Sequence, residues 1–160
     1  MTNNNIPLFS TLSTMTIQKM VSPHREKQDL TKGKWCDILL ADDDLNILES
    51  ISSCLKNDGF SITKASDGRA ALEAIKKNYF DLIISDLNMP RANGLAVLKE
   101  AKIANPDTIV IITSGDQDFE SVSEAFHLGA DSYLVKPFGP DELYRHINKC
   151  FEELEQKKRA

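Results

Sequence analysis

The chain has 160 residues, and 41% of them are hydrophobic, which is enough for one globular domain with a sizeable core. Its formal net charge of −5 argues against non-specific binding to nucleic acid. No apolar run approaches membrane-spanning length and the N-terminus lacks the pattern of a signal peptide, so we expect a cytoplasmic protein without a membrane partner.

The first 36 residues differ in composition from the rest. Residues 1–36 are rich in Asn, Ser, Thr and Lys, and they hold more basic than acidic side chains. Their apolar residues recur with only rough helical spacing, which favours a mobile polar tail over a short docking helix. We therefore expect the folded domain to span residues 37–157, with 158–160 as the C-terminal end.

From residue 37 onward, short apolar runs alternate with amphipathic stretches. Five runs of β-branched or aliphatic residues predict strands at Ile38–Ala41, Ser61–Ala65, Leu82–Ser85, Thr108–Thr113 and Ser132–Val135. Apolar residues at helical spacing predict a helix after each run. The predicted buried faces, in chain order, are Leu45, Leu48, Ile51 and Leu55; Ala70, Ala71, Leu72, Ala74 and Ile75; Leu95, Val97, Leu98 and Ala101; Val122, Ala125 and Phe126; and Leu143, Ile147, Phe151 and Leu154.

Five strand–helix repeats predict an α/β fold. Near-continuous apolar strands joined by helices indicate a parallel sheet that is covered on both faces. Right-handed crossovers then give a doubly wound five-stranded parallel sheet with five helices. Ligands of such folds bind at the carboxyl ends of the strands, so the residues that follow each strand are the candidate site.

Polar side chains stand at four of these strand ends. They are Asp42, Asp43 and Asp44 after the first strand, Asp86 at the third, Thr113 and Ser114 at the fourth, and Lys136 before Pro137 at the fifth. Clustered carboxylates raise each other's pKa unless a cation neutralises them, and Mg²⁺ is a hard cation that prefers oxygen ligands. A lysine and a hydroxyl could hold the remaining oxygens of a phosphoryl group. The pattern indicates a phosphoryl site with an Asp nucleophile, in which Asp44 serves as a helix N-cap.

Four segments resemble the response-regulator receiver family of two-component signalling. They are ILLADDD (38–44), DLIISDLNMP (81–90), IVIITSG (109–115) and SYLVKPF (132–138). The resemblance extends from Asp37 to about Lys157 and is closest to the single-domain type found among chemotaxis regulators. It implies a flavodoxin-like sheet with strand order 2-1-3-4-5.

The resemblance implies a phosphoacceptor and a metal site. Asp86 would take a phosphoryl group from a histidine kinase or a phosphotransfer protein of a phosphorelay. Asp42 and Asp43, together with Asp86 and the backbone carbonyl of Asn88, would bind Mg²⁺. The domain would promote its own phosphorylation and dephosphorylation without being an enzyme that acts on a separate substrate.

The resemblance also implies a switch. Thr113 and Lys136 would contact the phosphoryl group, and the peptide bond between Lys136 and Pro137 would be cis. Thr113 would move toward the phosphoryl group while the ring of Tyr133 turns inward. The surface formed by the predicted fourth helix, fifth strand and fifth helix would then bind a downstream protein, and the chain would be a monomer or a weak, activation-dependent dimer.

Other functions remain open at this stage. A haloacid-dehalogenase-like phosphatase also uses an Asp nucleophile and Mg²⁺, but it requires D-x-D-x-T/V, and Asn46 stands where Thr or Val is needed. A receiver-like module that is not phosphorylated usually lacks the acid pair, the acceptor or the lysine. The chain could also be a receiver fragment of a longer regulator. No phosphate-binding G-x-x-x-x-G-K-[ST] motif is present.

Overall fold

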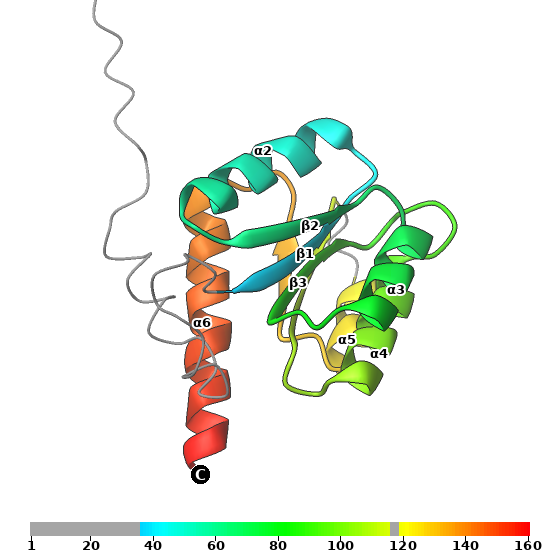
Figure 1. Cartoon of the computed structure of the whole chain (residues 1–160). Coiled ribbons are helices and arrows are strands. Elements are labelled where there is room, and N and C mark those ends of the chain that lie inside the picture. The colour runs from blue at the N-terminus through cyan, green and yellow to red at the C-terminus, as the bar shows by residue number, and fades with distance from the viewer. Residues whose placement is uncertain (1–35, 116–118) are drawn as a thin grey trace, which may run out of the picture.

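A computed structural model describes residues 36–115 and 119–160 and contains a single parallel sheet (Figure 1). The strands follow the order β2-β1-β3-β4-β5. The strands are β1 (Asp37–Ala41), β2 (Ser61–Ala65), β3 (Leu82–Asp86), β4 (Ile109–Ser114) and β5 (Ser132–Val135). The helices are α2 (Leu45–Asn57), α3 (Gly68–Lys77), α4 (Gly94–Ala104), α5 (Phe119–His127) and α6 (Pro140–Arg159). The predicted fold class and strand order are confirmed.

Alternate residues of each strand enter two separate cores because side chains alternate across a sheet. In β1, Ile38 and Leu40 join one core with residues of α2 and α6. Leu39 and Ala41 join the other core, which holds buried residues of α3, α4 and α5. Figure 1 shows the corresponding layers, with α2 and α6 on one side of the sheet and α3, α4 and α5 on the other. Such two-sided burial explains why the inner strands are apolar on both faces until they reach their polar ends.

Two predicted core residues are exposed. Leu45 is 64% exposed because it opens α2, and a side chain in the first turn points back toward the helix N-terminus, past the end of the sheet. Phe126 is 50% exposed because the buried side of α5 is centred on Ala125, one residue and about 100° away around the helix. The buried face of α2 instead includes Ser52, which hydrophobic periodicity could not reveal.

Polar side chains fix where the helices begin. Asp44 is the N-cap of α2, as predicted, and its carboxylate accepts hydrogen bonds from the backbone N–H groups of Asn46 and Ile47. Asp67 and Asn93 cap α3 and α4 in the same way. These caps place the helix N-termini at the carboxyl edge of the sheet.

The two ends of the domain differ from each other. The predicted polar tail, residues 1–36, lies outside the described residues except for Cys36, which is fully buried in the core. At the other end, α6 continues to Arg159, and Lys158 forms an ion pair of 3.3 Å with Asp107 near the start of β4. No helix in the described ranges is both long and apolar enough to cross a membrane.

Candidate functional site

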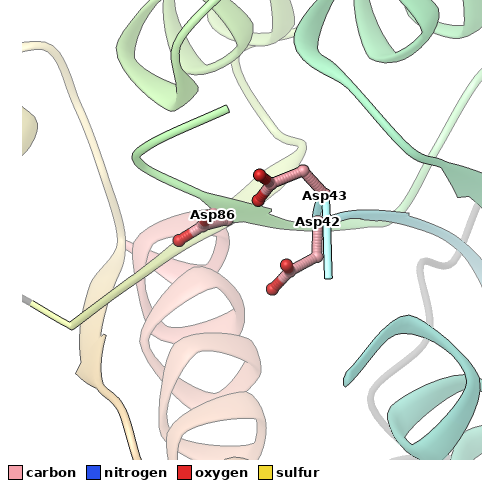
Figure 2. A group of neighbouring side chains, drawn as sticks. All are labelled: Asp42, Asp43 and Asp86. Atoms are coloured by element: carbon pink, nitrogen blue, oxygen red, sulfur yellow. The ribbon is translucent and has the colours of Figure 1, made fainter. Parts of the chain in front are cut away.

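Three carboxylates meet at the carboxyl ends of two adjacent strands. Asp42 and Asp43 follow β1, and Asp86 is the last residue of β3, its neighbour in the sheet (Figure 2). One carboxylate oxygen from each lies within 4.8 Å of the others. Asp42 and Asp86 are 2% and 6% exposed, whereas Asp43 is open to solvent. The cluster thus has a buried base and an accessible side.

Lys136 joins the two buried carboxylates. It follows β5, and its ammonium Nζ lies 2.7 Å from Asp42 Oδ2 and 3.2 Å from Asp86 Oδ1. The backbone N–H of Lys136 donates to the carbonyl of Ser114, which holds this segment beside the end of β4. The peptide bond from Lys136 to Pro137 is cis, in agreement with the resemblance.

The backbone around Asp42 orients its carboxylate. Asp42 N–H donates to the carbonyl of Ala65 at the end of β2. Its Oδ1 accepts from the backbone N–H of Asp44 at 2.8 Å, while Oδ2 accepts from Lys136. Both oxygens therefore have a donor, which compensates in part for the burial of this charge.

Burial and charge shift the pKa values of the central groups. The pKa of Asp86 lies above its ordinary value, mainly because burial penalises the ionised form and also because Asp42 and Asp43 repel its charge. Lys136 offsets this only partly. Burial by itself would lower the pKa of Lys136, but its hydrogen bond to Asp42 and the charge of Asp86 outweigh this effect, and its pKa is raised. Lys136 therefore remains a cation.

Thr113 lies beside Asp86 in the sheet. The two residues are register partners in the parallel pairing of β3 with β4, and Thr113 is 2% exposed. The carbonyl of Thr113 accepts from the backbone N–H of Leu87 at 2.8 Å, so the first residue after Asp86 is also hydrogen-bonded to β4. The structure thus brings together Asp42, Asp43, Asp86, Thr113 and Lys136, all of which the sequence singled out.

The remaining two predicted residues lie around this cluster. Asn88 is exposed in the loop that follows Asp86. Tyr133 is partly buried on β5, where it packs against the core formed with α3, α4 and α5. It pairs with Ile112 in the register of β4 with β5, one residue before Thr113.

Sequence reasoning missed the role of Gly94. A Cβ atom at this position would lie 2.4 Å from the carbonyl oxygen of Asp86 and 2.9 Å from Leu87 Cα. The first turn of α4 therefore contacts the backbone of Asp86 itself, and only glycine leaves room for it. A glycine at the start of a helix is typical of a turn, and nothing in the neighbouring sequence indicates its contact with Asp86.

Comparison with known proteins assigns the family. The family model described as the response regulator receiver domain matches residues 38–148. The chain belongs to this family. It is therefore the receiver domain of a response regulator, a component of two-component signalling.

Curated relatives match over the same region. The transcriptional regulatory protein ZraR of Escherichia coli K12 is 36% identical over 114 residues, which cover 71% of this chain and 26% of ZraR. The transcriptional regulatory protein DltR of Streptococcus agalactiae is 37% identical over 111 residues, covering 69% of this chain and 49% of DltR. The chain thus spans between a quarter and a half of the length of these relatives.

Solved receiver domains share the fold. A CheY-like receiver domain protein from Methanospirillum hungatei superimposes with a TM-score of 0.72 at 29% identity, covering 76% of this chain and 97% of that one. The receiver domain of Francisella response regulator 1452 gives a TM-score of 0.67 at 36% identity, covering 74% and 98%. Both cover almost all of the solved chain, so the match is to a complete receiver domain.

Proposed function

We propose that Asp86 is the phosphoacceptor of this receiver domain and takes its phosphoryl group from a histidine kinase or a phosphotransfer protein. The observation that carries the proposal is the position of Asp86, whose carboxylate lies between two further carboxylates and a cationic lysine at the end of a central strand. An Asp side chain can act as a nucleophile and form an acyl phosphate. The pKa of Asp86 is raised mainly because burial penalises its charge, and in part because Asp42 and Asp43 repel it, which a nearby cation would relieve.

The donor set fits Mg²⁺. Three carboxylates with oxygens within 4.8 Å, one of them solvent-accessible, form the kind of hard-oxygen site that this ion prefers. Asp42, Asp43 and Asp86 would hold it, with the backbone carbonyl of Asn88 as a further ligand. When bound, Mg²⁺ would neutralise charge on the carboxylates and on the phosphoryl oxygens.

The chain's own residues would then carry out the transfer. An oxygen of the Asp86 carboxylate attacks phosphorus, and the bond from phosphorus to the imidazole nitrogen of the donor breaks, leaving the electron pair on that nitrogen. Lys136 holds a phosphoryl oxygen as a permanent cation, consistent with its raised pKa. The Thr113 hydroxyl donates to another oxygen. The same site would later admit water, which hydrolyses the acyl phosphate of Asp86. In both steps the domain would act on its own side chain and not on a separate substrate.

Phosphorylation would bias a conformational equilibrium. Movement of Thr113 toward the phosphoryl group would vacate space next to Tyr133. In the pairing of β4 with β5, Tyr133 lies opposite Ile112, the residue directly before Thr113. The ring of Tyr133 would turn inward and change the surface of α5, β5 and α6. A downstream protein would respond to the signal because it binds this surface better in one of the two states. It would bind either a monomer of this chain or a weak dimer that forms on activation.

A second candidate role is that of a receiver portion within a longer regulator. It is supported by the share of the relatives that the chain spans, 26% of ZraR and 49% of DltR. The chemistry at Asp86 would be the same, and the α5–β5–α6 surface would act within one polypeptide.

Incubation with acetyl phosphate and Mg²⁺ tests the proposed function. Intact-mass spectrometry should show the addition of one phosphoryl group, and chelation of Mg²⁺ should abolish it. The Asp43→Ala protein should require more Mg²⁺ for the same extent of labelling. Labelling that is independent of Mg²⁺ in both proteins would contradict the proposal.

A further inference from the structure

The loop after the acceptor is attached to a helix outside the site. This loop, residues 87–93, joins β3 to α4. The carbonyl of Pro90 accepts a hydrogen bond from the backbone N–H of Gly68, the first residue of α3, at 3.3 Å. A Cβ atom at Gly68 would lie 1.8 Å from the carbonyl oxygen of Ala92. The start of α3 and the far half of the loop therefore pack backbone against backbone.

An ion pair reinforces this contact. Arg91 Nη1 donates to Asp67 Oδ2 at 2.9 Å, and the side chain of Asp67 is only 13% exposed. The other oxygen of the same carboxylate, Oδ1, accepts from the backbone N–H of Ala70 at 2.8 Å as the N-cap of α3. The carboxylate is thus held by the helix on one side and holds Arg91 on the other. Both groups are charged, which strengthens the hydrogen bond, but the Arg91 side chain is 67% exposed, so solvent screens part of the attraction.

The backbone of Arg91 shows that the contact matters for the loop conformation. Its φ is +70°, in the left-handed region that side-chain-bearing residues other than Asn and Asp rarely adopt. Local preference of arginine therefore does not explain this geometry, and surrounding contacts must maintain it. Three contacts surround it: the backbone N–H of Ala92 donates to the carbonyl of Pro90 at 2.9 Å across Arg91, Gly68 N–H donates to the same carbonyl at 3.3 Å, and the Arg91 side chain pairs with Asp67.

The near half of the loop is anchored to the site. Leu87 N–H donates to the carbonyl of Thr113, and the carbonyl of Leu87 accepts from Gly94 N–H, both at 2.8 Å. Asn88 and Met89 are the two residues between this anchor and the one at Pro90 and Arg91. The side chain of Met89 is buried in the core formed with α3, α4 and α5. A shift at Pro90 and Arg91 would therefore be taken up mainly by the exposed Asn88.

We propose that Asp67 and Arg91 are positioning residues for the phosphorylation site, which hold the β3–α4 loop so that the Asn88 carbonyl faces the three carboxylates. This inference rests on the proposed function, because it assigns the Asn88 carbonyl to the cation. Neither side chain touches the reacting atoms. They act through the loop backbone, as outer partners of a metal ligand commonly do.

Three substitutions separate positioning from general stability. Asp67→Asn keeps an oxygen to cap α3 but removes the charge opposite Arg91. Arg91→Asn removes the cation with a residue that tolerates positive φ, so it adds no backbone strain. Arg91→Lys restores a cation. The matched control is Arg69→Ala, which breaks the exposed Arg69–Glu73 pair within the same helix, 3.4 Å long, without touching the loop.

Two readouts are measured on the full chain. Hydrogen exchange of the amides of 88, 89, 91 and 92 without metal reports loop order, and calorimetric titration with Mg²⁺ reports affinity. We expect Asp67→Asn and Arg91→Asn each to accelerate exchange and to weaken Mg²⁺ binding by about tenfold, the low end of the usual effect of losing an outer partner of a metal ligand. The double variant should be no weaker than either single one, Arg91→Lys should recover most of the affinity, and Arg69→Ala should match the unmodified chain.

The outcomes distinguish the inference from the function on which it rests. Unchanged Mg²⁺ affinity in both Asn variants overturns the inference alone, even if their loop exchanges faster. Equal weakening by Arg69→Ala also overturns it, because the effect would then be general. If the unmodified chain itself fails to bind Mg²⁺ or to accept phosphate, the proposed function fails, and the inference with it. Should Asp67→Asn not fold, Arg91→Asn and Arg91→Lys still provide the decisive comparison.

Discussion

The ammonium of Lys136 lies 2.7 Å from the carboxylate of Asp42, although the two residues are 94 positions apart in the chain. The contact crosses the carboxyl edge of the sheet from β5 to β1. It places the cationic side chain expected to hold a phosphoryl oxygen on a carboxylate expected to hold the metal ion. The two roles are therefore coupled, since whatever draws Lys136 toward a phosphoryl group also changes the charge around Asp42.

Replacing Lys136 by Met should separate cation binding from phosphoryl transfer. Because a positive charge beside Asp42 and Asp86 disappears, we expect Mg²⁺ to bind more tightly, by about tenfold or less. Phosphorylation by acetyl phosphate should nevertheless slow by about tenfold or more, because a phosphoryl oxygen loses its charged partner. Calorimetry and intact-mass kinetics measure the two effects. A variant that binds Mg²⁺ more weakly would refute the coupling.

Asp86→Asn should stabilise the metal-free protein at neutral pH. The folded state raises the pKa of Asp86 above 3.8, so the native state binds the proton more tightly than the unfolded state. Stability from this group is therefore present at low pH and falls as pH rises from about 3.8 through the raised pKa. The amide cannot ionise, and we expect a gain of about 1 to 3 kcal/mol at neutral pH.

The pH dependence provides the control for this prediction. The stabilisation by Asp86→Asn, measured by urea unfolding without metal, should shrink as the pH approaches 3.8 from above. Glu152→Gln, which replaces an exposed carboxylate on α6, should leave stability within about 0.5 kcal/mol at each pH. A gain from Asp86→Asn that is the same at all pH values would point to packing instead of charge.

Gly94→Ala should damage the site through the backbone. The added methyl group would meet the carbonyl oxygen of Asp86 at 2.4 Å, so the start of α4 or the end of β3 must move. Overpacking of this kind costs about 1 to 3 kcal/mol. Gly115→Ala is the matched control, because its Cβ would have nothing within 4 Å and it directly follows β4, at the same end of the sheet. Equal unfolding midpoints for the two variants would argue against the contact.

Much of this arrangement could be predicted from sequence. Strand ends in a parallel sheet meet at one edge, so Asp42, Asp86, Thr113 and Lys136 could be brought together from their positions after apolar runs alone. Contacts that depend on backbone geometry could not. The left-handed backbone at Arg91 and its bond to Asp67 arise from how α3 packs against the loop, and no periodicity encodes this. The exposure of Phe126 likewise depends on how α5 is rotated against the sheet.

A stable mimic of the phosphorylated state should change the surroundings of Tyr133. With beryllium fluoride and Mg²⁺, we expect the ring resonances of Tyr133 in an NMR spectrum to shift, because the ring leaves its present partly buried position. Tyr79 is the internal control and should not respond, because it is 48% exposed and precedes β3, at the end of that strand away from Asp86. Identical spectra for Tyr133 with and without beryllium fluoride would contradict the proposed switch.

The most direct test of the central claim is to locate the phosphoryl group. After reaction with acetyl phosphate and Mg²⁺, reduction of the acyl phosphate with borohydride and peptide mass spectrometry should find the modification on Asp86 and nowhere else. The Asp86→Asn protein should acquire none under the same conditions. Modification of a different residue in the unmodified chain, or full labelling of Asp86→Asn, would contradict the assignment of Asp86 as the phosphoacceptor.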